Sequence, residues 1–382
     1  MEQNLHDDPL VLVPKIILTK IISKKVMEGL MRFVSCLEVP HCLDDLQYSF
    51  NQRGELRHLV TKEPFVYNYY KNEHVRNHKR YKILGDMITL HVYELLEKEC
   101  NLERITIPLD ASEEEPKSFF FMSKEPLTKQ TNLFVLLQDS GVIRAGQWSQ
   151  KVIVHQSLDK GTQIPYINTA LRDNSSVIVL NPNDNFAEMK EEPQTLVKKE
   201  DDATAVEPRE ACDLISTEQK LILPKRCCSS PEEHTSYVWD HFISKTTAKN
   251  VFFIAHGYGG LVFMDLLCKK SQEVRSKVSA VAFIDSRHHA QHQARTDPDI
   301  QTWIRLHCRS WVLSTKPLDR PTGSLRKLDC PKVSTGTQNH ELAPSSALQS
   351  IFRFLNRSSK SRRNSVPPMR TMVTRSSSRK SV

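Results

Sequence analysis

The sequence lacks the features that mark membrane proteins and disulfide-bonded secreted domains. No apolar run in its 382 residues approaches the roughly 20 residues that a membrane-spanning helix needs. Its nine cysteines are odd in number and include no C-x-x-C pair, so they favour neither a disulfide framework nor a zinc site. The N-terminus opens with acidic residues, and lysines interrupt its apolar stretch, which makes a poor secretory signal. We therefore expect no membrane contact and a reducing compartment, the nucleus or the cytoplasm.

Acidic and aromatic residues are both missing from residues 356–382. This segment holds eight Lys or Arg residues, which account for the whole net charge of +8 and leave the rest of the chain near neutral. We predict a globular body followed by a disordered, basic tail rich in serine and arginine. Without aromatic residues the tail cannot stack on bases, so weak, nonspecific RNA contact is its alternative role. Two basic clusters predict nuclear import: Lys360, Arg362 and Arg363, and Arg375, Arg379 and Lys380.

Long apolar runs alternate with helical patterns through the body of the chain. These runs are apolar throughout, which is typical of strands that are covered on both faces. Alternation of strand and helix at this spacing predicts an α/β fold, a doubly wound and mainly parallel sheet with helices on both faces. The expected strands are 118–123, 132–141, 175–182, 251–256, 278–285 and 309–317. The expected helices are 73–99, 147–156, 163–172, 231–247, 260–273, 297–307 and 345–355.

The same pattern divides the chain into three parts. Residues 1–42 form a variable N-terminal arm, residues 43–355 form one α/β domain, and residues 356–382 form the tail. Between 186 and 229 the sequence becomes charged and proline-containing and loses its apolar periodicity. We predict a disordered acidic insertion there, inside the single domain.

The stretch "IAHGYGGLV", residues 254–262, has the layout of a nucleophile elbow. In this turn a reactive serine sits between small residues on a sharp bend from strand to helix. Ala255 and Gly259 are the small flanks, and Gly260 allows the helix to pack on the strand. The nucleophile position itself holds Gly257, which has no hydroxyl group. We predict an elbow without its nucleophile.

Two further side chains stand where a hydrolase would carry its triad. Asp319 directly follows the expected strand 309–317. His340 lies further along the chain, in a loop before the last expected helix. Asp285, which ends an earlier strand, is the alternative acid. Nucleophile, acid and histidine in this order match α/β-hydrolases. We therefore interpret Gly257, Asp319 and His340 as vestigial triad positions.

The region that would bind an oxyanion is altered as well. It comprises Gln138, Asp139, Ser140 and Gly141, together with Tyr258 at the start of the helix after the elbow. A carboxylate at Asp139 would repel a developing oxyanion instead of stabilising it. The sequence thus departs from hydrolase chemistry at two independent places.

Several long segments of the sequence resemble a known family. "NLFVLLQDSGVIRAGQW", "GTQIPYI", "VIVLNPN", "SPEEHTSYVWDHFI", "HGYGGL" and "GTQNHEL" resemble the Arb2 domain, named for an Argonaute-binding protein. The chain looks most like the vertebrate cotranscriptional regulator group that carries this domain, and within it the divergent second paralogue. The resemblance covers roughly residues 43–355.

The resemblance implies an α/β-hydrolase-like fold and a nuclear or nucleocytoplasmic adaptor. Its expected protein partners are Argonaute, chromatin or splicing factors. In the closer relatives the elbow holds serine and the oxyanion stretch holds His-Gly, whereas this sequence holds Gly257 and Asp139. The leading hypothesis is therefore a catalytically inactive adaptor in alternative splicing or in Argonaute- or chromatin-linked silencing. The alternatives are a residual serine-type esterase or amidase, with Ser140 as nucleophile, and a small-molecule-binding pseudoenzyme.

Histidines cluster in "DSRHHAQHQARTD", which includes His288, His289 and His292. A metal site needs acids or further histidines at ligand spacing, and two adjacent histidines point in different directions. We interpret this stretch as a polar loop over the mouth of the pocket. Neither a metal nor a cofactor is expected.

Overall fold

The long apolar runs assemble into one sheet. The computed structural model describes residues 42–124, 131–189, 221–288, 297–323 and 329–364. Its main sheet has eight strands in the order β12-β11-β10-β9-β5-β6-β4-β3, parallel from β12 to β6 and antiparallel at β4 and β3. The strands are β3 (Leu102–Ile107), β4 (Ser118–Ser123), β5 (Asn132–Leu137), β6 (Ser176–Val179), β9 (Asn250–His256), β10 (Val278–Ile284), β11 (Cys308–Val312) and β12 (Lys332–Ser334).

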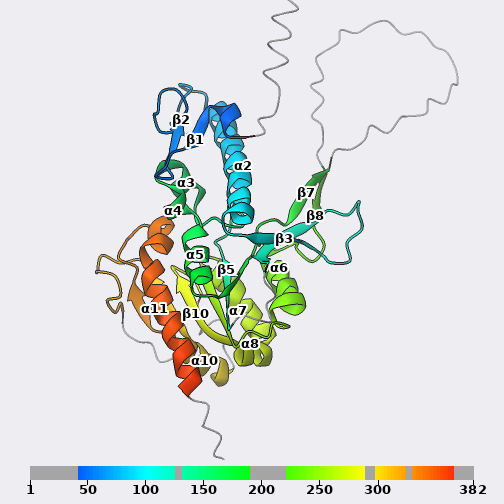
Figure 1. Ribbon diagram of the computed structural model, residues 1–382, viewed down its shortest axis with the longest axis vertical. Helices are drawn as coiled ribbons and strands as arrows, with labels where there is room; N and C mark the ends of the chain where they lie inside the picture. Colours follow the sequence, from blue (N-terminus) through cyan, green and yellow to red (C-terminus); the bar gives the residue numbers. More distant parts are fainter. Residues whose placement is uncertain (1–41, 125–130, 190–220, 289–296, 324–328, 365–382) are drawn as a thin grey trace, which may run out of the picture.

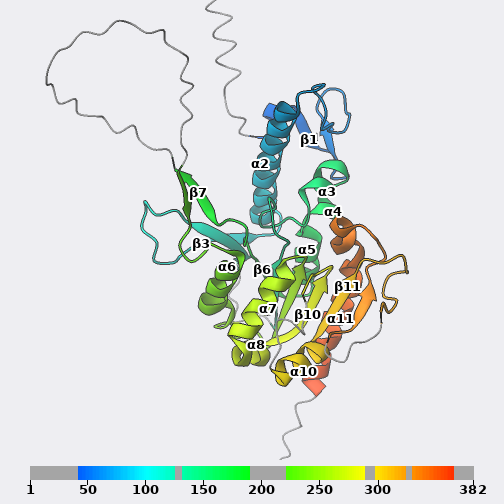
Figure 2. The same cartoon turned by 180° about the vertical axis from the view of Figure 1, so that it is seen from behind.

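Helices cover both faces of this sheet. In β5, Phe134 and Leu136 point into one hydrophobic cluster, whereas Leu133 and Val135 point into the other, and all four are at most 1% exposed. The first cluster packs under α2 (His74–Lys98), α3 (Gln150–His155), α5 (Ile164–Arg172) and α11 (Ala343–Asn364) (Figure 1). The second packs under α6 (Pro231–Val238), η2 (Trp239–Ile243), α7 (Gly259–Lys269), α8 (Ser271–Lys277) and α10 (Pro298–His307), which Figure 2 shows from behind. The predicted mainly parallel α/β sheet is confirmed.

The order in which strands join the sheet reverses direction between β5 and β9. From β5 the chain runs to β6 on one side, and it later returns to add β9 on the other side. The loop after β5 therefore leads toward one side of the sheet, and the loop after β9 leads toward the other side. In open α/β sheets this point, at the carboxyl ends of the strands, is where ligands bind.

Local sequence signals explain where helices start. Ser230 caps α6 by accepting a hydrogen bond from the Glu233 N–H at 3.1 Å, with Pro231 in the first turn. Asp297 caps α10 in the same way, accepting from the N–H groups of Asp299 and Ile300. These caps satisfy amide groups that a helix cannot satisfy by itself.

Two strands of the sheet were not predicted, and each gives a weak signal. β3 lies at the antiparallel edge of the sheet and buries only its end residues, Leu102 and Ile107, and β12 has only 3 residues. A small hairpin of β1 (Tyr48–Phe50) and β2 (Leu56–His58) adjoins α2 near the start of the domain (Figure 1). Short or half-exposed strands lack the continuous apolar run on which the sequence argument relied.

The boundaries of the insertion and of the tail need correction. A hairpin of β7 (Phe186–Met189) and β8 (Leu221–Pro224) occupies both ends of the predicted insertion, and residues 190–220 lie outside the described residues. The tail does not begin at 356, because α11 continues to Asn364 and buries Ser359, whose hydroxyl accepts a hydrogen bond from Asn250. The arm at 1–41 lies outside the described residues, as do Arg375, Arg379 and Lys380.

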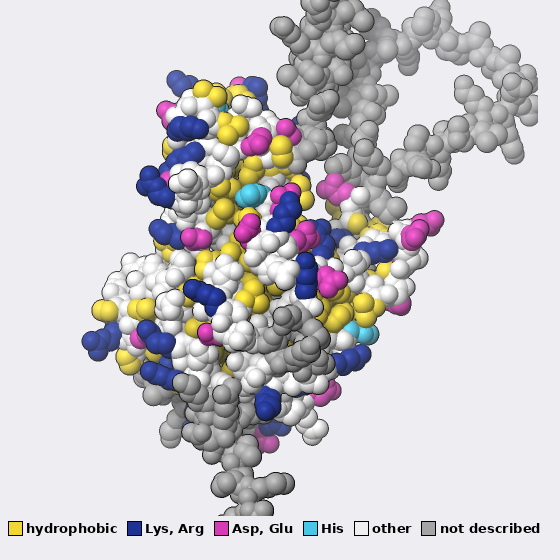
Figure 3. Space-filling model, viewed as in Figure 1, with side chains coloured by type: hydrophobic (Ala, Val, Ile, Leu, Met, Phe, Trp, Pro, Cys, Tyr) yellow, Lys and Arg dark blue, Asp and Glu magenta, His cyan; other side chains and the backbone are white. Residues whose placement is uncertain are grey.

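The surface carries charges of both signs. Figure 3 shows Lys and Arg side chains interspersed with Asp and Glu over the visible face, in keeping with a near-neutral body. Among the described residues, no helix combines the length and the apolar character that crossing a bilayer would require.

Candidate functional site

Four loops at the carboxyl edge of the sheet bring together the polar residues singled out in the sequence. Asp139 follows β5, Gly257 follows β9, and Asp285 follows β10. His340 begins η3 (His340–Leu342), between β12 and α11. Because β5, β9 and β10 are adjacent and parallel, their ends meet at one point of the edge. We call Asp139, His256, Asp285 and His340 the His340 cluster.

His340 lies between two carboxylates. Its Nε2 is 2.9 Å from Asp139 Oδ2, and its Nδ1 is 2.7 Å from Asp285 Oδ2. A neutral imidazole has one donor nitrogen and one acceptor nitrogen, whereas the protonated ring donates from both. Two carboxylate partners therefore favour the imidazolium form.

The pKa values follow from this arrangement. Hydrogen bonds to Asp139 and then to Asp285 raise the pKa of His340 to about 9, against an opposing effect of burial. Burial raises the pKa of Asp139, but hydrogen bonds from His340 and from the Tyr258 and Ser140 amides outweigh it and bring the pKa to about 2. At neutral pH the pair is ionic, and an imidazolium cannot accept a proton from a nucleophile.

The Asp139 carboxylate fills the place where a nucleophile would stand. Gly257 has a left-handed backbone, with φ of +53°, and its N–H donates to the Ile284 carbonyl at 3.0 Å. A Cβ atom added at Gly257 would overlap the carboxylate of Asp139. The elbow thus lacks a hydroxyl and also has no room for one.

The same carboxylate occupies the backbone donors that an oxyanion would need. Asp139 Oδ1 accepts hydrogen bonds from the Tyr258 N–H at 2.6 Å and from the Ser140 N–H at 2.8 Å. In a hydrolase, the amide after the nucleophile and an amide of the preceding strand's loop bind the reacting oxygen. Gln138 is buried beside them, and Gly141 is exposed with φ of +109°. The predicted oxyanion region is therefore bound by the chain's own carboxylate.

The acid that faces the histidine is Asp285, and the first choice from the sequence, Asp319, is corrected. Asp319 accepts hydrogen bonds from the Ser350 hydroxyl and from Arg353 Nη2, the latter at 2.8 Å. Both partners belong to α11, so Asp319 holds this helix to the loop after β11. Chain order could not separate the two acids, because both follow parallel strands.

Two residues of the site, His256 and Asn183, were not predicted from the sequence. His256 is 1% exposed and stacks on the His340 ring with 4.3 Å between centroids, and its Nε2–H donates to the His340 carbonyl at 3.3 Å. Burial lowers its pKa to about 4, so it stays neutral beside the charged ring. Asn183 donates from Nδ2 to the Asp139 carbonyl at 2.8 Å. The position of His256 next to Gly257 was a usable signal.

Ser140, the alternative nucleophile, is exposed and joins the site through its backbone N–H. Both ring nitrogens of His340 are already bonded to carboxylates, so neither is available to deprotonate the Ser140 hydroxyl. The arrangement can hold charge and orient loops. Ser140 and His340 therefore do not form the pair of nucleophile and base that acyl transfer requires.

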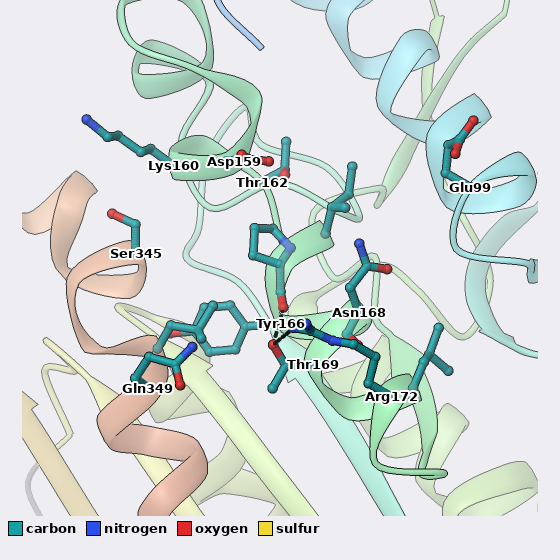
Figure 4. A pocket seen from close by; sticks show the side chains of 14 residues that line it. Glu99, Asp159, Lys160, Thr162, Tyr166, Asn168, Thr169, Arg172, Ser345 and Gln349 are labelled. Atoms are coloured by element: carbon teal, nitrogen blue, oxygen red, sulfur yellow. Dashed lines mark hydrogen bonds between the residues drawn. The ribbon is translucent and has the colours of Figure 1, made fainter. Parts of the chain in front are cut away.

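Two hollows of the surface lie apart from the His340 cluster. A groove of 860 Å³ runs between α5 and α11, where Figure 4 shows Tyr166 near Gln349, and Arg172 beside Thr169. A second cavity of 590 Å³ lies between α2 and the loop before α3, with Tyr81 among the residues that line it. None of the residues lining either hollow belongs to the His340 cluster.

His288 also departs from the prediction for its loop. It is 5% exposed and stacks on Phe283 with 3.9 Å between ring centroids, so it belongs to the interior and not to a polar loop at a pocket mouth. His289 and His292 lie outside the described residues.

Comparison with known proteins gives one family and several long relatives. Residues 39–318 match the family profile described as the Arb2 domain. The human protein ARB2BP is 48% identical over 354 residues, which are 92% of this chain and 98% of that protein. Human cotranscriptional regulator ARB2A is 45% identical over 363 residues, 90% of this chain and 86% of that protein. A solved structure of the histone deacetylase Clr3 aligns at 14% identity with a TM-score of 0.45, covering 76% of this chain and 45% of that one.

Proposed function

Because this chain belongs to the Arb2 domain family, we propose that it is a catalytically inactive, α/β-hydrolase-like adaptor in nuclear RNA regulation. Relatives that align over most of its length are named cotranscriptional regulators. Alternative splicing and Argonaute- or chromatin-linked silencing are the processes we propose for it. Its partners are proteins of those processes, bound through the surface of the α/β domain.

One observation supports the loss of catalysis above all others. The Asp139 carboxylate fills the nucleophile position at Gly257, binds the Tyr258 and Ser140 amides, and pairs with His340. Nucleophile, oxyanion donors and base are thus disabled by a single side chain. An adaptor needs none of the three, and the ion pair instead joins the loops after β5, β10 and β12.

A serine-directed fluorophosphonate tests this proposal. Wild-type protein is expected to remain unlabelled, because no hydroxyl near His340 can be deprotonated. A Ser140→Ala variant is the matched control for the residual esterase or amidase alternative. Stoichiometric labelling that disappears in Ser140→Ala would establish an enzyme. In parallel, the full chain is purified by affinity with and without RNase. Argonaute or splicing factors retained after RNase support a protein adaptor, and their absence in both arms contradicts it.

We also propose that the protein is present in both the nucleus and the cytoplasm. Its basic clusters at 360–363 and 375–380 direct nuclear import. Truncation at 356 would cut into α11, so substitution is the cleaner test. Replacing Arg375, Arg379 and Lys380 by glutamine, alone and with the cluster at 360–363, is expected to lower the nuclear fraction several-fold. The matched control replaces three exposed lysines of the body: Lys79, Lys98 and Lys245. An unchanged nuclear fraction in the combined variant refutes import by these clusters.

A further inference from the structure

A second group of chemically reactive side chains lies away from the His340 cluster. His288 comes from the loop after β10, and Asp329 and Cys330 come from the segment that leads into β12. His288 Nε2 is 3.9 Å from Cys330 Sγ and 4.0 Å from Asp329 Oδ1, and the three ligand atoms all lie within 4.8 Å of one another. Imidazole, thiolate and carboxylate are the three side-chain groups that bind zinc.

The histidine is held in the orientation that a ligand requires. Its Nδ1 lies 2.9 Å from Ser286 Oγ, which leaves Nε2 directed at Asp329 and Cys330. Its ring stacks on Phe283, and its side chain is 1% exposed. A metal-binding histidine almost always uses its other nitrogen for such a fixing contact. The Asp329 side chain is 13% exposed, so water can reach the group from that side.

We propose that His288 Nε2, Asp329 Oδ1 and Cys330 Sγ bind a divalent cation of the zinc type, with water as the fourth ligand. Bond lengths for tetrahedral zinc place nitrogen and oxygen about 3.3 Å apart and nitrogen and sulfur about 3.6 Å apart. The nitrogen–oxygen distance of 4.0 Å is therefore about 0.7 Å longer than in a zinc site, and the nitrogen–sulfur distance of 3.9 Å is about 0.3 Å longer. Binding would draw the three side chains together by these amounts.

The charges of the group suit a divalent cation. A Cys330 thiolate and the Asp329 carboxylate together neutralise two positive charges, and His288 binds as a neutral ring. Lys332 Nζ lies 2.6 Å from Asp329 Oδ2, which leaves Oδ1 directed at His288. The lysine therefore neighbours the metal position without occupying it.

The other close sets of candidate ligands differ in kind. In the His340 cluster both nitrogens of His340 are bonded to carboxylates, so this histidine is held in an ion pair and has no nitrogen left for a metal. Cys228 and His234 form a buried pair with 3.5 Å between Sγ and Nδ1, but within the part of the chain that the structure describes they do not belong to a group of three ligands. This pair provides a matched control.

A bound cation would fix the loop that carries the acid of the His340 cluster. Only Ser286 and Arg287 separate His288 from Asp285. Ser286 also packs against the start of α7, where a Cβ added at Gly260 would overlap its hydroxyl. Binding at His288 therefore ties Asp285, the elbow helix and β12 together. This inference does not depend on the proposed adaptor role.

Titration of the purified full chain with Co²⁺ tests the site. A thiolate-to-cobalt charge-transfer band in the near ultraviolet is expected at one ion per chain, with Zn²⁺ displacing it. Cys330→Ser is expected to abolish the band and His288→Ala to weaken binding at least tenfold, whereas Cys228→Ser keeps the band. A chain without any band at saturating Co²⁺, or a band that survives Cys330→Ser, overturns the proposal.

Two milder variants separate a loss of metal binding from a failure to fold. Asp329→Asn changes a partly exposed ligand, and Ser286→Ala removes only the contact that orients His288. Ser286→Ala is expected to weaken Co²⁺ binding by about 10- to 100-fold, as for other second-layer contacts of metal sites. Thermal unfolding with and without Zn²⁺ supplies a second readout, because an ion that binds the native state raises Tm. A Zn²⁺-induced rise in Tm that persists unchanged in folded Asp329→Asn and Cys330→Ser places binding elsewhere and refutes the site.

Discussion

Replacing Asp139 with asparagine is expected to lower the pKa of His340 from about 9 by roughly one to three pH units. Asparagine has the same shape but no charge, and its Nδ2–H can donate to a neutral Nε2 of His340. The Nδ1–H would still donate to Asp285. A pH titration of the His340 ring by NMR measures the change directly.

Asp319→Asn is the matched control for this experiment. Asp319 is also a carboxylate after a parallel strand, but its partners are Ser350 and Arg353. The pKa of His340 is expected to stay the same in that variant. If Asp139→Asn leaves the pKa of His340 near its wild-type value, the ion pair that underlies the proposed loss of catalysis is not present.

The same pair makes stability depend on pH in a defined direction. The folded pKa of His340 lies above its ordinary value of 6.5, so its stabilising contribution is complete below pH 6.5 and is lost as the pH rises through about 9. The folded pKa of Asp139 lies below 3.8, so its contribution is present above that pH and is lost as the pH falls through about 2. The difference in free energy of unfolding between wild type and Asp139→Asn is thus expected to be largest between pH 3.8 and pH 6.5. Urea unfolding at several pH values measures this difference.

Restoring serine at the elbow by itself is expected to harm the protein without restoring chemistry. Gly257→Ser introduces a Cβ into the space of the Asp139 carboxylate and places a non-glycine residue at φ of +53°. Overlap and backbone strain together are expected to lower the free energy of unfolding by about 2–4 kcal/mol. The variant should remain unlabelled by fluorophosphonate, because the Asp139 carboxylate still fills the space beside position 257 and still binds Nε2 of His340.

Removing the obstruction at the same time is expected to relieve the overlap and to allow labelling, although the backbone strain at position 257 remains. In Gly257→Ser combined with Asp139→Gly, the new hydroxyl can reach Nε2 of His340, whose Nδ1 remains bonded to Asp285. The Tyr258 amide becomes free to stabilise an oxyanion. Recovery of stability relative to Gly257→Ser, together with labelling at the introduced serine, would show that the rest of the site persists. Labelling of the single variant as strong as that of the double variant would instead show that Asp139 does not block the elbow.

Continuous apolar runs are the feature of this sequence from which its strands can be predicted. The apolar runs of β5, β9 and β10 predicted a buried parallel sheet, because strands covered on both faces need apolar residues at every position. β3 and β12 were missed because an edge strand and a strand of three residues carry no such run. The motif around Gly257 located the sharp turn from β9 to α7, at which Gly257 has a left-handed backbone.

The sequence by itself determined the sheet, the elbow without a hydroxyl and the order in which carboxylates and histidine follow the strands. Only the tertiary structure decided which carboxylates meet His340, because hydrogen bonding depends on distances of about 3 Å that residue order does not specify. In the structure Asp285 is bonded to His340, whereas Asp319 is bonded to Arg353. The Asp139 carboxylate lies in the space beside Gly257. The tertiary structure likewise joined His288 to Asp329 and Cys330 across some forty residues of chain, a contact that ligand spacing along the sequence could not reveal.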